Sequence, residues 1–326
     1  MCLANSINQQ RHDKIDDIEN NPAQNFLKII DDDLILFDGN CQYVEPSNLK
    51  LQSDPISNFN ILYANIHSVP SKINDLKRLL EDFQNSNVTV DIILLCETFI
   101  NDINKSQCKL QGYQLIEEHR ISKTKGGVAI YINDRLRYKE RSDLKLFKEG
   151  FFESCFVEIK NNVKDILVGV VYRVPGTSEK DFLKDYENLI NLLNSENKEI
   201  IIGSDQNLDY LKIDQHPNTA KFLELNLSSN LMPTVVKPTR VTHTSATLID
   251  NIYLSSRLCT NATSRIITSD ISDHFPCFVS LGNFKHQSRN PLIFNTRKVT
   301  QQSIDEMNIK LNFINWDRLD VLNAND

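Results

Sequence analysis

Carboxylate, amide and phenol side chains end several apolar runs of this chain. Asn65 and Glu97 end the first two runs, and Tyr172 ends a later one. Asp205 and Asn207 come just after a short isoleucine run that stops at a glycine. Because strand ends meet at one edge of a packed sheet, we expect these side chains to face a shared cleft. Any one of them taken alone is more typical of a turn than of a catalytic site.

These residue types match the requirements of phosphodiester hydrolysis. The reaction needs a hard cation held by carboxylate oxygens, which can stabilise charge on the phosphate. Glu97 is the expected metal ligand, with Asn65 and Asp273 as further candidates. Asp205 is the expected group that orients or deprotonates the attacking water.

Other polar residues fit the phosphate itself. Asn207 lies two positions after Asp205, so both side chains fall on one side of an extended segment, and Asn207 can donate to a phosphate oxygen. The phenol of Tyr172 can donate a second hydrogen bond. His274 would donate to the developing charge, and Asp250 is the carboxylate expected to fix its tautomer. A histidine alone in this position would equally suit a satisfied core residue.

The composition is that of an ordinary globular protein, with 326 residues of which 40% are hydrophobic and 24% charged. The net charge of −7 hides a local split. Residues 1–55 hold four Lys and Arg against ten Asp and Glu, whereas residues 119–148 hold nine against three. The basic stripe suits phosphate contacts, for which we expect Arg120, Lys123 and Lys125, although a solvated surface would look similar.

Seven scattered cysteines without a C-x-x-C pair argue against a disulfide framework and against a zinc site. Cys96 and Cys155 lie in apolar runs and are expected to be buried. The start of the chain has no signal-peptide pattern, and no apolar run reaches the ~20 residues of a membrane span. These features predict a protein of a reducing, intracellular compartment without a membrane partner; they leave the oligomeric state open.

The patterning predicts one catalytic domain at residues 59–283 between an acidic, poorly ordered leader (1–58) and a polar tail (284–326). The leader has a short candidate strand at 34–37, and the tail a helix at 303–313. Strands and helices mix without strict alternation, which favours two packed mixed β-sheets flanked by helices, an α/β (α+β) fold. Strands are expected at 60–65, 88–95, 127–132, 154–159, 166–172, 200–202, 251–254, 264–267 and 275–281. Helices are expected from Pro70, with Ser71 as N-cap, and around 186–193.

Several motifs occur together in one order along the chain. They are Asn65, Leu95–Thr98, Gly126–Tyr131, Val171–Arg173, Asp205–Asn207, Leu248–Asp250 and Ser272–Pro276. This ordered set resembles the endonuclease/exonuclease/phosphatase superfamily, and within it the apurinic-type endonuclease domain of non-LTR (LINE-like) retrotransposon polyproteins. The resemblance runs from about residue 60 to residue 281.

The resemblance implies a four-layer α/β sandwich, dependence on Mg²⁺ with Mn²⁺ as an alternative ion, and a DNA substrate. It implies nicking of target DNA to leave a 3′-hydroxyl, with a nuclear site of action. It also implies the metal, water-activating and phosphate roles given above, including the Asp250–His274 pair. Thr242 resembles the family's threonine on a DNA-facing loop.

The chain departs from the family pattern in a few places. Gly-Asp-Phe-Asn becomes Gly203–Asn207, with Ser204 as an apparent extra residue and Gln206 in place of Phe. An insertion here would displace Asp205, and a misplacement of about 1 Å can cost ~10²-fold in rate. His67 stands where arginine is common. No segment resembles a reverse transcriptase active site, so the sequence indicates a fragment or truncated copy of such an element.

Three hypotheses follow. The first is a Mg²⁺-dependent DNA endonuclease. The second is a phosphomonoesterase or phospholipase of the same superfamily, which secreted or membrane-facing features would favour. The third is a non-catalytic DNA-binding remnant, which the loss of Glu97, Asp205 or His274 would have indicated; all three residues are present.

Overall fold

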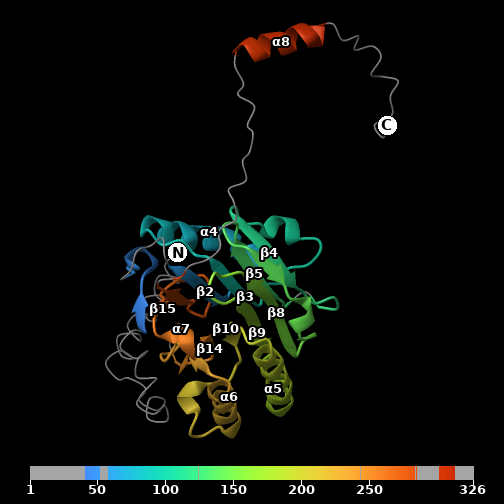
Figure 1. Ribbon diagram of the computed structural model, residues 1–326. Helices are drawn as coiled ribbons and strands as arrows, with labels where there is room; N and C mark the ends of the chain where they lie inside the picture. Colours follow the sequence, from blue (N-terminus) through green and yellow to red (C-terminus); the bar gives the residue numbers. More distant parts are fainter. Residues whose placement is uncertain are drawn as a thin grey trace. The chain divides into compact units, whose positions relative to one another are not determined.

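Two seven-stranded β-sheets form the centre of the protein (Figure 1). The computed structural model describes residues 41–51, 58–123, 125–242, 244–282, 284 and 301–312. The first sheet has, in spatial order, β1 (Gln42–Val44), β15 (Ala262–Ile267), β16 (Cys277–Leu281), β2 (Phe59–Asn65), β3 (Ile92–Cys96), β5 (Val128–Asn133) and β4 (Tyr113–Glu118). The second has β11 (Leu231–Pro233), β14 (Asp250–Ser255), β10 (Glu199–Asp205), β9 (Ile166–Arg173), β8 (Phe152–Ile159) and β6 (Tyr138–Glu140), with β7 (Phe147–Lys148) also paired to β8.

Helices cover the outer faces of the two sheets. Helix α4 (Val69–Asn85) packs on the first sheet, while α5 (Glu179–Ser195) and α6 (Pro217–Ser228) lie on the second (Figure 1). A short hairpin, β12 (Arg240–Val241) and β13 (Ala246–Thr247), and the one-turn α7 (Ser256–Cys259) flank β14. Single turns of 3-10 helix occur at Pro46–Asn48, Lys105–Cys108, Ser142–Leu144 and Tyr210–Lys212. The predicted sandwich of two mixed sheets flanked by helices is confirmed.

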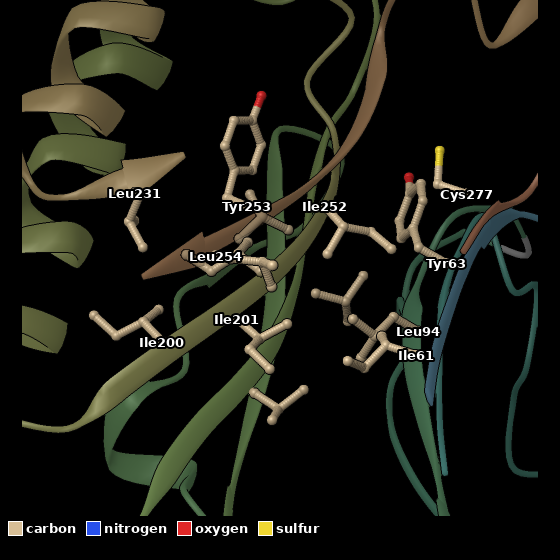
Figure 2. Packing of buried hydrophobic residues seen from close by; sticks show 14 of the residues in the cluster. Ile61, Tyr63, Leu94, Ile200, Ile201, Leu231, Ile252, Tyr253, Leu254 and Cys277 are labelled. Carbon is tan, nitrogen blue, oxygen red and sulfur yellow. The ribbon is translucent and has the colours of Figure 1, made fainter. Parts of the chain in front are cut away.

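The central strands are buried on both faces because their apolar runs are continuous. In β2, Ile61 and Tyr63 point between the sheets, whereas Leu62 and Ala64 belong to the cluster under α4. This is the two-residue alternation of a strand. Figure 2 shows Ile61, Tyr63 and Leu94 of the first sheet facing the second across the inter-sheet core.

Helix α4 begins earlier than the sequence indicated. Its N-cap is Ser68, whose side chain accepts a hydrogen bond from the backbone N–H of Ser71, so the prediction of Ser71 as the cap is wrong. Pro70 lies in the first turn, where its missing N–H has no cost. The helix buries one apolar face, which includes Ile73, Leu76, Leu79, Leu80 and Phe83.

Part of the predicted leader belongs to the first sheet. Strand β1 pairs in parallel with β15, and Cys41 before it is fully buried. The Tyr43 hydroxyl donates to the carbonyl oxygen of Pro238 at 2.7 Å, and its ring lies 6.1 Å from that of Phe275. The prediction of a poorly ordered leader is therefore wrong for residues 41–51. The candidate strand at 34–37 lies outside the described residues.

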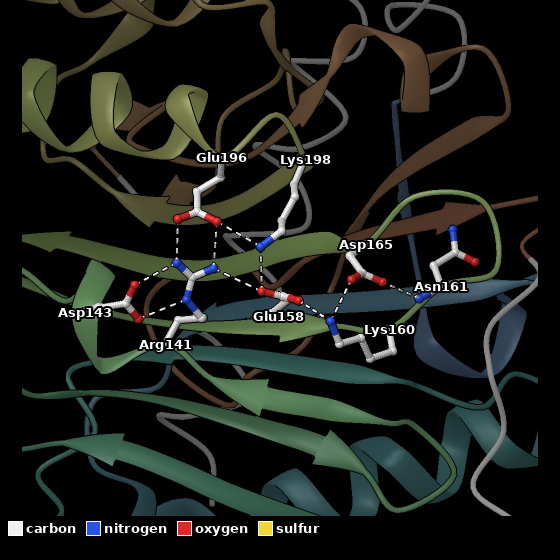
Figure 3. Close-up of polar contacts among 8 residues, drawn as sticks. All are labelled: Arg141, Asp143, Glu158, Lys160, Asn161, Asp165, Glu196 and Lys198. Carbon is white, nitrogen blue, oxygen red and sulfur yellow. Dashed lines mark hydrogen bonds and ion pairs between the residues drawn. The ribbon is translucent and has the colours of Figure 1, made fainter.

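A network of ion pairs joins β6 and β8 to the C-terminal end of α5 (Figure 3). At its centre, the nearly buried Arg141 guanidinium contacts Asp143, Glu158 and Glu196 at 2.7–3.0 Å. Lys198 bridges Glu158 and Glu196. Arg141 was counted in the basic stripe, but these three carboxylates neutralise it.

The tail is a separate unit, residues 290–326. Helix α8 (Gln301–Asn312) confirms the helix predicted at 303–313 to within two residues. Within the parts of the chain that the structure describes, none of the helices has the length and apolarity needed to cross a membrane.

Candidate active site

The predicted polar residues meet at one edge of the two sheets. Asn65 ends β2, Glu97 directly follows β3, and Tyr172 lies next to last in β9. Asp205 is the last residue of β10, and its partner across the antiparallel pair is Asp250, the first residue of β14. Parallel pairing of β2 with β3 and of β9 with β10 brings their carboxyl ends to the same edge. The polar residues after these strands therefore lie together at one edge of the sheets.

Asn65 links the two sheets at this edge. Its Nδ2 donates to Glu97 Oε1 at 3.0 Å and to Asp205 Oδ2 at 2.9 Å. The Tyr172 hydroxyl donates to the same Glu97 oxygen at 2.9 Å. The Oδ1 atom of Asn65 is buried and has no hydrogen-bond partner among the described residues. The site thus holds two carboxylates and an uncommitted amide oxygen, which are ligands that a hard cation prefers.

Asp205 is 1% exposed, and its environment favours the neutral acid. Burial and the nearby charge of Asp250 raise the pKa of Asp205 to about 7, against the opposing effects of His274 and the Asn65 hydrogen bond. Its Oδ1 accepts the backbone N–H of Asn207 at 3.0 Å. A carboxyl group that titrates near neutral pH and is held at both oxygens is suited to accept a proton.

The apparent insertion at Ser204 does not displace Asp205. Residues 199–205 pair one to one with β9, and residues 201–205 pair likewise with β14, so Ser204 occupies a regular strand position. Gly203, the residue before Ser204 in the strand, faces the first sheet. An added Cβ at Gly203 would lie 2.5 Å from the Tyr63 ring. Gln206, in place of the family's Phe, is fully buried, and neither its Oε1 nor its Nε2 has a partner among the described residues.

Asn207 is fixed by the buried Arg173. The Asn207 Nδ2 donates to the Arg173 carbonyl at 2.8 Å, and Arg173 Nη2 donates back to the Asn207 carbonyl at 2.8 Å. The Asn207 backbone has φ 51°, a left-handed conformation that asparagine tolerates. Because an amide nitrogen carries two hydrogens, one of them is left for a phosphate oxygen.

His274 and Asp250 form the predicted pair. His274 Nδ1 donates to Asp250 Oδ2 at 2.8 Å, and both side chains are buried. Burial lowers the pKa of His274, but the carboxylate of Asp250, its hydrogen bond and the charge of Asp205 outweigh this effect and raise the pKa to about 9. The ring is therefore an imidazolium at neutral pH, oriented by Asp250.

Two residues that the sequence analysis missed also hold Asp250. Thr239 Oγ1 donates to Asp250 Oδ2 at 2.6 Å, and the fully buried Tyr63 hydroxyl donates to Oδ1 at 3.4 Å. Thr242, the threonine that was predicted, instead accepts the backbone N–H of Ser245 at 3.0 Å in the turn of the β12–β13 hairpin. The sequence contains the string Pro238-Thr239-Arg240, but nothing in it indicates that the Thr239 hydroxyl donates to Asp250.

Asp273 forms an ion pair with Arg240. Both Nε and Nη2 of Arg240 contact Asp273 Oδ2, at 2.9 and 2.7 Å, and the Asp273 side chain is 49% exposed. Burial raises the pKa of Asp273, but His274 and Arg240 together lower it below its usual value. Asp273 is thus engaged by Arg240, and its role as a metal ligand with Glu97 and Asn65 stays a prediction.

A second group of residues has the spacing of a metal site. In the described part of the chain, only Asp205, Asp250 and His274 form a set of three or more His, Cys, Asp or Glu residues whose ligand atoms lie within 4.8 Å of one another. A protonated His274 has no free lone pair for a metal, so this set could bind an ion only with His274 deprotonated. Metal binding by Glu97 and Asn65 does not require deprotonation of a histidine.

His67, which replaces the family's arginine, lies beside Glu97. Its Nδ1 is 3.2 Å from Glu97 Oε2, and its side chain is 60% exposed. Both residues have a left-handed backbone, with φ 49° for His67 and 51° for Glu97. Such conformations cost roughly 1–3 kcal/mol in non-glycine residues and are concentrated at functional sites.

The three predicted DNA contacts divide into two kinds. The Arg120 side chain is 8% exposed and ion-pairs with the buried Glu153, which also accepts the backbone N–H of Gly127 at 2.6 Å. Arg120 is therefore a structural cation, and its prediction as a DNA contact is wrong. Lys123 and Lys125 are exposed on the same loop. The end of this loop is tied beside Glu97 by two backbone bonds, from Phe99 N to Gly126 O and from Thr98 N to Gly127 O.

The sequence matches the Endonuclease/Exonuclease/phosphatase family over residues 58–274, a span that includes every catalytic and metal residue named above. The chain belongs to this family. Its fold and paired acidic site are those of a hydrolase. A comparison with curated proteins gives no match.

Several solved structures share the fold. The endonuclease domain of TRAS1, a telomere-specific non-LTR retrotransposon, is 14% identical with a TM-score of 0.53, covering 69% of this chain and 98% of that one. AP endonuclease LMAP from Leishmania major is 14% identical with a TM-score of 0.59, covering 80% and 98%. D. rerio TDP2 complexed with single strand DNA product is 12% identical with a TM-score of 0.51, covering 69% and 98%.

Proposed function

We propose that this protein is a metal-dependent DNA endonuclease that hydrolyses one phosphodiester and leaves a 3′-hydroxyl, as part of a retrotransposon-like element acting on nuclear DNA. The observation that carries the proposal is the position of Asn65 between Glu97 and Asp205, opposite the Asp250–His274 pair. The site combines a cation-binding side, a basic carboxylate and a charged proton donor. The fold shared with the TRAS1 endonuclease domain supports a DNA substrate.

The residues at Glu97 fit a hard divalent cation. Glu97 Oε2 is contacted by His67, which is mostly exposed, and the orphaned Oδ1 of buried Asn65 offers a second oxygen. Oxygen ligands of this kind suit Mg²⁺, with Mn²⁺ as a substitute. When bound, the ion would neutralise charge on the phosphate and on the leaving oxygen.

The chain's own groups then account for the protons. Asp205 accepts a proton from the attacking water, and Asn65 and the Asn207 backbone hold its two oxygens in place. Asn207 donates a hydrogen bond to a phosphate oxygen, and the single hydrogen of the Tyr172 hydroxyl, which points to Glu97 in this structure, would turn to the phosphate once Glu97 binds the cation. His274, already protonated through its pairing with Asp250, donates to the phosphate as its charge develops.

The charge of the loop beside Glu97 favours a polyanionic substrate over a small phosphoester. Exposed Lys123 and Lys125 on the loop next to Glu97 add positive charge that a DNA backbone can use.

Analysis of the product ends tests this proposal. The purified chain is incubated with an end-labelled duplex and, separately, with a small phosphomonoester, in Mg²⁺, Mn²⁺ or EDTA. We expect metal-dependent nicks that DNA polymerase extends without phosphatase treatment. Nicks ending in a 3′-phosphate would refute the proposed chemistry, and turnover of the phosphomonoester without nicking would favour the phosphatase alternative.

A further inference from the structure

Arg240 lies beside the catalytic pair without a role in the mechanism above. It begins the β12–β13 hairpin, pairs with Thr247, and forms an isolated antiparallel bridge with His274. The preceding residue is held at three points: Thr239 N donates to Thr247 O, Phe275 N donates to Thr239 O, and Thr239 Oγ1 donates to Asp250. The backbone that carries Arg240 is therefore fixed relative to His274.

The Arg240 side chain is fixed at one end and open at the other. Its Nε and Nη2 both contact the single oxygen Oδ2 of Asp273, and the side chain remains 45% exposed. A guanidinium has five N–H donors, and within the described residues Arg240 has no other partner. The planar donors of a half-exposed guanidinium can match the oxygens of a phosphate.

The charges of the site make such a cation necessary. Four carboxylates (Glu97, Asp205, Asp250 and Asp273) lie at or beside this edge, where they would repel a DNA phosphate. One divalent cation at Glu97 and the His274 imidazolium offset part of this charge. Asp273 is already engaged by Arg240, so the positive charge at this side of the site comes from the chain itself.

We propose that Arg240 binds the DNA phosphate at the cleavage site, and that Asp273 is a positioning residue for its guanidinium and not a metal ligand. This inference rests on the proposed endonuclease function. The first part of the inference is that Arg240 contacts the substrate. The second part is that Asp273 does not bind the metal.

Binding of DNA without catalysis tests the first part. The affinity of the full chain for a labelled duplex is measured in EDTA by fluorescence anisotropy across a range of salt concentrations. Loss of one phosphate contact lowers the slope of log affinity against log salt by ~1. We expect this change for Arg240→Gln, a retained slope for Arg240→Lys, and no change for the matched control Arg257→Gln, an exposed arginine in α7.

Nicking kinetics test the second part. We expect Arg240→Gln to slow nicking by about 10²-fold, and Arg240→Lys to recover only part of the rate because it lacks the planar fork. Asp273→Asn should slow nicking while leaving unchanged the Mg²⁺ concentration that gives half-maximal rate. Its effect should also be smaller in the Arg240→Gln background, since a positioning residue acts through Arg240.

Three results would overturn the inference. If the wild type binds and nicks DNA but Arg240→Gln keeps its salt slope and rate, Arg240 does not bind the phosphate and the endonuclease function still stands. If Asp273→Asn raises the Mg²⁺ midpoint, Asp273 is a metal ligand. If the wild type neither binds nor nicks DNA, the proposed function fails and the inference fails with it.

Discussion

The hydrogen bond from Thr239 to Asp250 gives a sharp test of how the catalytic pair is held. The substitution Thr239→Val keeps the shape of the side chain and removes only the hydroxyl. That hydroxyl donates at 2.6 Å to Asp250 Oδ2, the oxygen that also accepts from His274 Nδ1. A hydrogen bond to a charged group contributes about 1.5–3 kcal/mol.

The effect on activity follows from this magnitude. If about half to all of that free energy stabilises the transition state, the nicking rate should fall by roughly 5- to 150-fold, since 1.36 kcal/mol is a factor of ten. Loss of the donor also leaves more negative charge on Asp250 for His274, so the pKa of His274 should rise above its value of about 9.

Two measurements check this prediction. Single-turnover nicking gives the rate, and NMR titration of the His274 ring gives its pKa. Thr260→Val is the control, because the hydroxyl of the exposed Thr260 donates to the Arg257 carbonyl at 3.3 Å, outside the site. A Thr239→Val protein that nicks at the wild-type rate with an unchanged His274 pKa would refute the reasoning.

Three other predictions concern protonation, packing and ion pairing. The nicking rate should rise with pH as Asp205 loses its proton near pH 7 and fall as His274 loses its proton near pH 9; His274→Gln should remove the alkaline limb, and an alkaline limb that persists in this variant would contradict the assignment. Both pKa values are raised on folding, so these two groups stabilise the fold most at low pH. The free energy of unfolding should fall through Asp205 as pH rises from about 4 to 7, and through His274 as pH rises from about 6.5 to 9. Gln206→Met should raise the free energy of unfolding by about 1–3 kcal/mol in urea titrations, because it removes a buried amide without partners; lower stability would mean that the amide is satisfied. Arg141→Met should lower the free energy of unfolding by about 1.5–3 kcal/mol, because Glu158 and Glu196 lose the hydrogen bonds of the guanidinium but keep Lys198 as a shared partner, while the exposed Arg137→Met serves as control; equal stability of the two variants would show that Arg141 contributes nothing.

The sequence predicted the site because its residues follow buried strands. Apolar runs of three to seven residues indicated β2, β9 and β10, and the polar residues after them were therefore expected at the strand ends. The run at 88–95 was less well predicted, because Val88 and Val90 are buried without pairing and the strand is only Ile92–Cys96. Short strands of two or three residues, such as β6 and β11–β13, carry no periodic signal and were missed.

Contacts between segments that are distant in the sequence could not be predicted from it. Nothing in its spacing shows that Arg120 is buried against Glu153 or that Arg240 pairs with Asp273, since a cation's partner depends on the packed sheets. The pairing of β1 with β15 joins positions more than two hundred residues apart. The string Gly203–Asn207 looked like an insertion, but the strand ladder shows a regular position for Ser204.

The most direct test of the central claim is the conversion of supercoiled plasmid to open circle by the purified chain. The assay compares the wild type with Asp205→Ala, in Mg²⁺ and in EDTA, after confirming that both proteins are folded. We expect open circles only from the wild type in Mg²⁺, since Asp205 is the group that accepts the proton of the attacking water. Equal nicking by Asp205→Ala, or no nicking by a folded wild type that binds DNA, would contradict the account.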